Sequence, residues 1–478
     1  MSSSIPAVIR RPQDVVDLVN THPARRGGAG IALIALGGVL IDAYQAAMIG
    51  FGNSYIADEY GISSGAAAAV NATVLVAALA GGLLARPLIE RLGQRRSFLL
   101  GMGLCAIAAA AVAFAPNIWF VLACRVVMGV GLGIDFPLAT SAVVELSGSK
   151  SSSSGRSVNL WQMGWYISTT VVYLVLLPLH QATSVESDLW RYGILVGAAL
   201  SLLVMVLRYV FIGESALWAA RRQRWDETVR ILRERYGVSA VVADDAVGSA
   251  PGSESPKVRG AYRVMFGPAY RRRTILGCVV ATMQAWQYNA VGIYLPVTLG
   301  GVLSGGLSGS LGGSALVNAA FGITGGLLGS LWVQRRGART LSMAGFAVVA
   351  VCLLALGGLG SNAPWLALLL LGLIIFGHAA GPGGLGMTIA TLSYPPSIRP
   401  AGVGFARAIM RTGSIAGLVL WPMLWDNLGT DAFFWLSIVP ALGLLTCLLI
   451  RWEPIGKPVD DEDAEVLKRI TVVSAGRA

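Results

Sequence analysis

The chain has 478 residues, of which 55% are hydrophobic and only 13% are charged, and its mean hydropathy is +0.67. Soluble globular proteins carry about 45–50% apolar and about 25% charged residues, so this composition excludes a soluble enzyme, a disordered chain and a disulfide-stapled secreted domain. The net charge of +11 is typical either of nucleic-acid binding or of a membrane protein that keeps its basic residues on the cytoplasmic side.

Twelve apolar segments are long enough to cross a bilayer, since a transmembrane helix needs about 20 mostly apolar residues. In chain order they are residues 28–51, 66–89, 97–116, 118–146, 158–180, 191–212, 274–299, 314–334, 340–360, 365–393, 401–426 and 430–452. The runs are continuous and do not alternate, which excludes a β-barrel. The first run is longer than a signal-peptide core, so we interpret it as a permanent span. The sequence therefore predicts an all-α, polytopic membrane protein with twelve transmembrane helices.

Basic residues alternate from one side of the predicted membrane to the other. Lys and Arg occur before span 1, after spans 2, 4, 8 and 10, in the long segment 213–273 and in the tail, whereas the intervening loops contain none: 52–65, 181–190, 300–313, 361–364 and 427–429. The positive-inside rule then places both termini in the cytoplasm and requires an even number of spans.

This topology predicts two six-helix bundles, at 28–212 and 274–452, joined by a cytoplasmic linker at 213–273 and flanked by cytoplasmic tails at 1–27 and 453–478. The linker begins with a pattern from Glu214 to Tyr236 that predicts one amphipathic helix, suited to anionic lipid headgroups or to covering the cytoplasmic mouth. Residues 239–258 are rich in Ser, Ala, Gly and Pro, which predicts disorder.

One short motif, [E/Q]-R-x-G-x-R, occurs once in each half, directly after span 2 and after span 8. Glycine allows a tight reversal of the chain. The arginines are expected to anchor to headgroups, or to pair with acids and helix C-termini of the neighbouring bundle. We therefore predict a structural ion-pair network or gate formed by Glu90, Arg91, Gly93, Arg95, Arg335, Gly337 and Arg339.

Five charged residues lie well inside the predicted spans: Asp42, Arg125, Asp135, Arg407 and Arg411. A charge at the centre of a bilayer costs at least about 2.5 kcal/mol, so such residues are functional candidates. Burial allows a carboxylate to take up a proton on one side and release it on the other, so Asp42 and Asp135 are the predicted proton-coupling groups. The alternative for both carboxylates is a structural ion pair with Arg125 or another neighbour.

The two arginines of span 11 are four residues apart and share a helix face. A guanidinium group suits a carboxylate or phosphate ligand, so we predict Arg411 as a substrate ligand, with Arg407 and Arg125 in structural ion pairs or a gate. Arg208 lies near a span end, where it is expected to extend to the membrane surface.

Polar side chains also follow one face of span 5 and one face of span 7. We predict that they contact the substrate together with Arg411, and the residues are Gln162, Tyr166, Gln284, Gln287 and Tyr288. Trp161 and Trp165 either pack or stack on a substrate ring, and His378 is either a core residue or a proton relay. The five cysteines are scattered through apolar runs and give no disulfide or metal framework.

Six plus six spans, a long cytoplasmic middle and the repeated turn resemble the major facilitator superfamily. Span 4 is similar to that of its sugar-porter-like branch, and most similar to proton:phosphate symporters, in the pattern Arg125-x3-Gly129-x-Gly131-x-Gly133-x-Asp135-x-Pro137. Gln45 and Gly383 replace residues of the phosphate transporters, and residues 283–289 lack their aspartate, so the resemblance implies the fold and the branch but not phosphate as the substrate. It implies a site near the membrane midplane and rocker-switch alternating access.

These observations together predict a secondary active transporter in a bacterial cell membrane, most simply a proton-coupled symporter that imports a small organic or aromatic anion. No nucleotide-binding motif is present, so ATP-driven transport is not expected. The expected partners are the small-molecule substrate, protons and the lipid bilayer, with no nucleic acid, cofactor or metal, for a monomer that is not an enzyme. A sugar, polyol or phosphate symporter is the alternative, and an efflux antiporter or a nutrient-sensing receptor is less favoured by the sequence.

Overall fold

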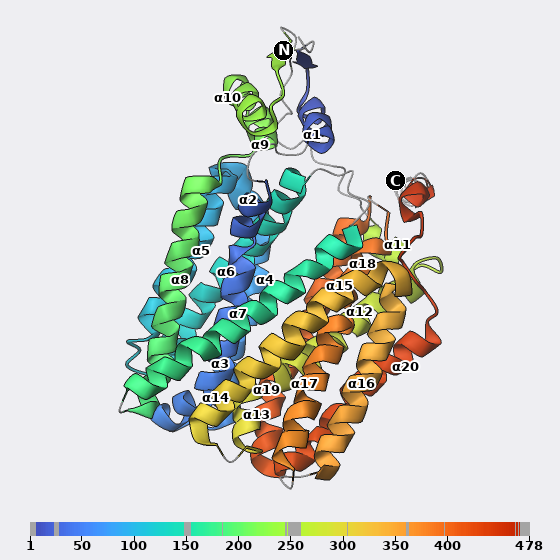
Figure 1. Cartoon of the computed structure of the whole chain (residues 1–478). Coiled ribbons are helices and arrows are strands. Elements are labelled where there is room, and N and C mark those ends of the chain that lie inside the picture. Colours follow the sequence, from blue (N-terminus) through green and yellow to red (C-terminus); the bar gives the residue numbers. More distant parts are fainter. Residues whose placement is uncertain are drawn as a thin grey trace. The chain divides into compact units, whose positions relative to one another are not determined.

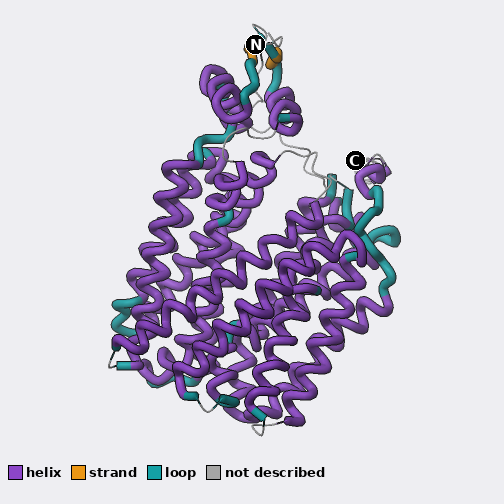
Figure 2. Tube along the Cα trace, in the orientation of Figure 1, coloured by secondary structure: helices purple, strands orange, loops and turns teal. Residues whose placement is uncertain are grey.

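The computed structural model describes residues 6–22, 28–147, 154–183, 185–243, 246, 260–303, 305–359, 363–395, 397–463, 465–466 and 468. Helices make up nearly all of this part of the chain, and its strands form a single short pair (Figure 2).

The elements follow one another from the N-terminus to the middle of the chain as β1 (Ala7–Ile9), α1 (Pro12–Thr21), α2 (Gly28–Ala35), α3 (Gly37–Tyr60), α4 (Ser64–Leu92), α5 (Gln94–Val112), α6 (Ile118–Ser147), α7 (Ser154–Ala182), η1 (Glu186–Asp188), α8 (Leu189–Phe211), α9 (Ala216–Arg221), α10 (Trp225–Ile231), η2 (Leu232–Tyr236) and β2 (Ala240–Val242).

The remaining elements are α11 (Ala261–Met265), α12 (Arg271–Gln287), η3 (Tyr288–Gly292), α13 (Leu295–Gly300), α14 (Gly306–Val317), η4 (Asn318–Ile323), α15 (Thr324–Arg336), α16 (Ala338–Leu359), α17 (Pro364–Ala380), α18 (Pro382–Leu392), α19 (Arg399–Leu428), η5 (Gly429–Asp431), α20 (Ala432–Leu449) and η6 (Val459–Glu462). Three of the short elements, η2, η3 and η4, are π-helical turns.

Ten helical segments of the described chain are long and apolar enough to cross a membrane. The last of them, Arg399–Leu449, contains both α19 and α20 and so covers two predicted spans. The predicted seventh span is the shorter helix α12, continued by the π-helical turn η3. The prediction of an all-α protein with twelve transmembrane helices is confirmed.

The contacts between residues divide the chain into two compact units, which we describe separately. The first unit comprises Met1–Asp42, Val76–Ser152 and Leu195–Lys257, and the second comprises Ala43–Leu75, Ser153–Ile194 and Val258–Ala478. The predicted division into bundles at 28–212 and 274–452 follows the internal repeat, and it stays a prediction.

Close helix packing in the first unit depends on the glycines of α6. A Cβ atom on Gly131 would lie 2.6 Å from the carbonyl oxygen of Gly101 in α5, and one on Gly133 would lie 2.1 Å from that of Ala78 in α4. Small residues let helix backbones approach each other in a membrane, where there is little hydrophobic force between helices. The glycine-rich stretch of α6 is therefore a packing surface.

The linker does not form the single amphipathic helix that the sequence predicts. It breaks into α9, α10 and η2, and Gln223 between the first two has a left-handed φ of 58°. Its buried side chains Ala220 and Leu232 pack with Val15 of α1, and β2 pairs in parallel with β1. Part of the predicted N-terminal tail is thus folded onto the linker, which covers the apolar face assigned to lipid. Most of the stretch predicted to be disordered, 239–258, lies outside the described residues.

The repeated glycine turn joins α4 to α5 in the first unit and α15 to α16 in the second. Gly93 and Gly337 have φ of 90° and 86°, and a Cβ on either would lie within 2.4 Å of a glutamate oxygen, of Glu214 or Glu453 respectively. Glu214 accepts a hydrogen bond from the backbone N–H of Gln94 at 2.7 Å, and Glu453 accepts one from that of Ala338 at 2.8 Å. Each glutamate therefore caps the N-terminus of the helix after the turn.

The last arginine of each motif completes the arrangement. Arg95 donates to the carbonyl oxygen of Tyr209 at 2.6 Å, and Arg339 donates to that of Cys447 at 2.7 Å, so each arginine caps the end of the last long helix of its own half. The predicted pairing with a neighbouring bundle is not what these two arginines do. Of the other motif residues, Glu90 pairs with Arg86 at 2.9 Å, and Arg91 and Arg335 are exposed.

The second unit is a layered helical bundle in which α15, α17 and α16 run alongside one another (Figure 1). Helix α7 packs against α14 and α15, and α12 packs against α18 and α19. A Cβ on Gly413 or Gly417 of α19 would lie 2.3 Å or 2.2 Å from a carbonyl oxygen of α12, of Thr282 or Trp286. These glycines let α19 lie directly on α12, which positions the polar face of α12 described below.

Candidate functional site

Buried polar and aromatic side chains meet in the second unit. We call this group the central cluster, and its members come from five elements: Gln162, Trp165, Tyr166 and Thr169 of α7, Gln287 at the end of α12, Tyr288 at the start of η3, Asn318 of η4, and His378 of α17. All but Trp165 are buried, and Trp165 is half-buried. The sequence predicts four of them as substrate ligands: Gln162, Tyr166, Gln287 and Tyr288.

Direct contacts link the members of the central cluster. Trp165 donates from Nε1 to the Tyr288 hydroxyl at 2.7 Å. The His378 ring stacks on Tyr288 with their centroids 4.7 Å apart, and its Nδ1 lies 3.2 Å from Nε2 of Gln287. The Tyr166 ring meets Tyr288 edge to face, at a centroid distance of 5.8 Å. Tyr288 is therefore the centre of an aromatic wall formed by three helices.

Local backbone features make room for these side chains. The π-helical turns η3 and η4 begin at Tyr288 and Asn318, and such turns change the direction in which the following residues point and are frequent at functional sites. Gly383 approaches so closely that a Cβ there would lie 2.7 Å from Nε2 of both Gln162 and His378. Substitution of Gly383 would therefore displace two members of the cluster.

Three polar atoms of the central cluster are buried without a hydrogen-bond partner in the described part of the chain: Oε1 of Gln162, the hydroxyl of Tyr166 and Oε1 of Gln287. Leaving a buried polar group unpaired costs about 1–3 kcal/mol, so native proteins rarely tolerate several side by side. The cluster therefore has unused hydrogen-bonding capacity next to aromatic rings, which suits a polar ring-shaped ligand.

Four members of the cluster were not predicted as ligands, namely Trp165, Thr169, Asn318 and His378. Two predicted ligands, Gln284 and Arg411, make no hydrogen bond or ring contact with the cluster in the described part of the chain. Asn318 is a lone amide in an apolar run, and its Oδ1 accepts from the Thr169 hydroxyl at 3.1 Å. His378 had remained open between a core residue and a proton relay. Gln284 is buried on α12, four residues before Tyr288. Sequence reasoning missed Asn318, although Ser310, Ser314 and Asn318 recur every four residues and form a polar stripe that could have indicated it.

In the first unit, the intramembrane acid Asp135 pairs with Arg208. Arg208 binds both carboxylate oxygens, with Nη2 and Oδ2 3.2 Å apart, and the side chains are only 1% and 2% exposed. It also donates to the carbonyl oxygens of Ile34 at 3.2 Å and Ala35 at 2.5 Å. The expectation that Arg208 extends to the membrane surface is wrong, because Asp135 and two free carbonyls hold it inside.

Asp42 lies close to this pair. Gly38, one helical turn before Asp42 on α3, approaches Asp135 so closely that a Cβ there would lie 1.7 Å from Oδ2. Both predicted proton-coupling residues therefore lie near one another in the first unit.

Arg125, which the sequence predicts in an ion pair, is fully buried but is not the partner of Asp135. Its Nη1 lies 3.9 Å from the Met128 sulfur, and its Nε and Nη2 have no hydrogen-bond partner among the described residues. The ion-pair role of Arg125 therefore has no support in the described contacts, while its burial keeps it a candidate for a role in transport.

The arginines of span 11, Arg407 and Arg411, are both half-buried on α19. No hydrogen bond or ion pair joins Arg411 to any other described residue. It lies two residues before Gly413, where α19 touches α12. Arg411 is therefore a half-buried cation, available to an anion, on a helix that packs against the helix carrying Gln287.

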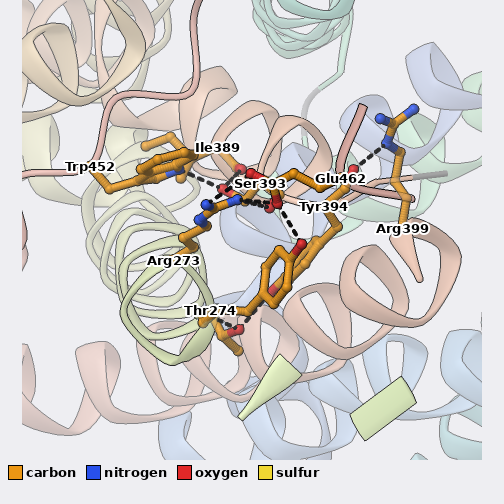
Figure 3. A network of polar contacts seen from close by, with 9 residues as sticks. Arg273, Thr274, Ile389, Ser393, Tyr394, Arg399, Trp452 and Glu462 are labelled. Atoms are coloured by element: carbon orange, nitrogen blue, oxygen red, sulfur yellow. Dashed lines mark hydrogen bonds and ion pairs between the residues drawn. The ribbon is translucent and has the colours of Figure 1, made fainter. Parts of the chain in front are cut away.

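A second polar network ties the C-terminal segment to the start of α12 (Figure 3). Arg273 pairs with Glu462 through two contacts of 3.1 and 3.2 Å and lies over the Trp452 ring, with Cζ 3.9 Å from the ring centroid. Trp452 in turn donates to the Ser393 hydroxyl at 3.1 Å. The charged groups of this network pair with each other within the protein. We therefore interpret the network as a structural contact that holds the C-terminal segment against α12.

Comparisons with known proteins agree with this architecture. The family model described as "Sugar (and other) transporter" matches residues 31–463. The niacin transporter NiaP of Acinetobacter baylyi is 23% identical over 87% of this chain and 92% of its own length. A gallate transporter of Pseudomonas putida is 24% identical over 92% of this chain and 95% of its own length.

Among solved structures, the inward-open xylose transporter XylE of E. coli is similar with a TM-score of 0.72 at 20% identity, covering 91% of this chain and 99% of that one. Another structure of XylE describes it as a proton:xylose symporter of the major facilitator superfamily. These likenesses show the fold.

Proposed function

Because the chain belongs to the sugar (and other) transporter family of the major facilitator superfamily, we propose that it is a proton-coupled symporter that imports a small aromatic carboxylate across the cell membrane. Transport by this superfamily proceeds by alternating access to a site near the membrane midplane. The observation that carries the choice of substrate is the central cluster, in which three unpaired polar atoms lie beside an aromatic wall.

Each part of an aromatic acid has a counterpart in this chain. The rings of Trp165, Tyr166 and Tyr288 offer faces and edges to a planar ring. The unpaired amide and hydroxyl groups of the cluster suit polar substituents on that ring. Arg411 supplies the guanidinium fork that suits a carboxylate. Two relatives are named for niacin and gallate, which supports an aromatic substrate here.

We assign proton coupling to Asp42 and Asp135. Asp135 is buried with its counter-ion Arg208, whereas Asp42 is only half-buried and is therefore the more accessible of the two carboxylates. In this proposal Asp42 takes up the proton. The loss of its negative charge then changes the electrostatic environment of the Asp135–Arg208 pair.

A sugar or polyol is the second candidate, favoured by one feature of the same cluster. Two of its unpaired atoms, Oε1 of Gln162 and of Gln287, are acceptors, and sugar hydroxyls are donors that would satisfy them. A sugar would leave Arg411 without a role in binding, and this difference separates the two candidates.

The test is uptake into proteoliposomes with an acidic exterior, using niacin, gallate, xylose and inorganic phosphate. We expect the natural protein to accumulate an aromatic acid. The Asp42→Asn variant should not accumulate it, while exchange of labelled for unlabelled substrate continues.

Arg411→Gln should weaken the affinity for the acid roughly 10–100-fold, since a charged hydrogen bond contributes about 1.5–3 kcal/mol. The exposed Arg336→Gln is the matched control. Accumulation of xylose alone, insensitive to Arg411→Gln, would favour the sugar instead.

A further inference from the structure

The first unit contains a strongly basic cavity that the transport proposal does not use. The cavity has a volume of about 440 Å³ and lies between the turn after α4 and the linker elements α9, α10 and η2. Seven arginines and three glutamates line it, with Trp218 on one wall. We call it the arginine cavity, and the positive-inside rule places it on the cytoplasmic side.

The three glutamates of the arginine cavity are too few to balance its seven arginines. Glu214 accepts backbone hydrogen bonds from Gln94 at 2.7 Å and Ser215 at 3.1 Å, so its charge is used by the glycine turn. Glu227 is shared between Arg224 at 3.5 Å and Arg230 at 3.9 Å. Clustered arginines without an equal number of acidic groups repel one another unless a bound anion neutralises part of their charge.

Three arginines of the cavity, Arg91, Arg96 and Arg235, have no hydrogen-bond or ion-pair partner among the residues that the structure describes. Arg91 and Arg96 come from the turn, and Arg235 comes from η2 in the linker. The cavity is therefore lined from two directions by guanidinium groups that are not paired within the protein.

Two further donors of the cavity are buried and unpaired in the described chain: Nε of Arg95 and Nε1 of Trp218. Arg95 is held in place by its bond to Tyr209, and the Trp218 ring lies under the guanidinium of Arg224, 5.0 Å from its centroid. Buried donors without an acceptor are destabilising by about 1–3 kcal/mol each. An anionic oxygen would accept hydrogen bonds from these two donors and would also offset the excess positive charge of the cavity.

We propose that the arginine cavity binds a phosphate-bearing anion, contacted by the arginines of the turn and the linker, with Trp218 against its organic part. A phosphoryl group carries several charges and acceptor oxygens, which suits a set of arginine forks better than one carboxylate does. The volume falls within the range of about 300–1,000 Å³ for organic ligands and exceeds what inorganic phosphate needs. The source of the phosphate is either a soluble phosphate ester or a phospholipid headgroup.

The proposal is tested with the full-length protein by binding alone, so it does not depend on the transport proposal. In detergent, titration calorimetry measures the affinity for inorganic pyrophosphate. In nanodiscs, native mass spectrometry measures retention of phosphatidic acid against phosphatidylcholine. The pair Arg96→Gln and Arg235→Gln removes one guanidinium from each side of the cavity. The matched control, Arg221→Gln with Arg233→Gln, removes the same charge from exposed residues of the same segment outside the cavity.

We expect the cavity variant to bind at least about tenfold more weakly, and the control variant to bind within about twofold of the natural protein. Binding of pyrophosphate assigns the site to a soluble ester, and selective retention of phosphatidic acid alone assigns it to a lipid headgroup. Equal losses in the two variants would show non-specific attraction and overturn the proposal. So would the absence of binding to either probe by the natural protein.

Discussion

The Asp135–Arg208 pair shows how a membrane protein keeps two charges away from water. Both side chains are almost completely buried, and the remaining donors of Arg208 reach carbonyl oxygens of Ile34 and Ala35 at the end of α2. A buried pair need not stabilise the fold relative to apolar residues, yet removing one partner leaves an uncompensated charge. A functional reason for keeping the pair is its position against α3, one helical turn from Asp42.

We predict that Arg208→Met lowers the free energy of unfolding by about 3–5 kcal/mol, because it leaves the Asp135 carboxylate buried without a counter-ion. The double variant Arg208→Met with Asp135→Leu should recover most of that loss, since it removes both charges. Thermal unfolding in detergent measures each variant. Equal destabilisation in the single and double variants would mean that packing, and not charge, is what Arg208 provides.

The cluster around Tyr288 shows that the helical periodicity of polar residues identifies only part of a binding site. Gln162 and Tyr166 follow a helical stripe, and so do Gln284 and Tyr288, which is why the sequence predicts them. His378 and Asn318 belong to other helices, where His378 has no polar neighbour at helical spacing and Asn318 follows only Ser310 and Ser314. Only the tertiary packing brings them to the same aromatic wall.

The repeated turn explains why one motif occurs in both halves of the chain. Its glycine takes a backbone conformation that other residues rarely adopt, and the space beside it is filled by a glutamate that follows the last long helix of the same half. Its last arginine caps the C-terminus of that helix. Burial raises the pKa of Glu214, while backbone hydrogen bonds from Ser215, Gln94 and Arg95 act against this.

We expect Gly93→Ala and Gly337→Ala to destabilise the protein by similar amounts, because both turns have the same geometry. The backbone strain alone is worth about 1–3 kcal/mol, and the added Cβ would also displace Glu214 or Glu453 from the helix N-terminus it caps. Gly30→Ala and Gly358→Ala, where no atom lies within 4 Å of the added Cβ, are the controls. Thermal unfolding is the measurement, and a change no larger than that of the controls would contradict this account.

At the scale of the whole chain, segments outside the long apolar helices belong to the tertiary structure of each unit. In the first unit, β1 and α1 cover the apolar face of the linker. In the second, the C-terminal segment is joined to α12 through Arg273, Glu462 and Trp452 (Figure 3). Val466 is buried in the same hydrophobic cluster as Tyr394. Segments predicted as tails and a lipid-binding helix are instead part of the tertiary structure.

We predict that Arg273→Ala releases the C-terminal segment, because it removes the ion pair with Glu462 and the cation–π contact with Trp452 together. Endoproteinase Glu-C should then cleave after Glu462 at least about fivefold faster, since local opening worth about 1 kcal/mol changes the exposed population by that factor. Mass spectrometry of the released peptide follows the cleavage. Arg272→Ala, an exposed neighbour, serves as the control and should leave the rate unchanged.

The membrane topology, the helical class and the position of the repeated turn could be predicted from the sequence, because hydropathy, charge alternation and glycine spacing are local properties of the chain. The partner of Asp135 could not, since Arg208 lies 73 residues away and near a predicted span end. The same holds for His378 beside Tyr288, for the glutamates beside the two glycines and for the folded linker. Helix packing decides which distant side chains meet, and close approach of helices at a few glycines sets its geometry. The order of polar and apolar residues along the chain does not specify these contacts.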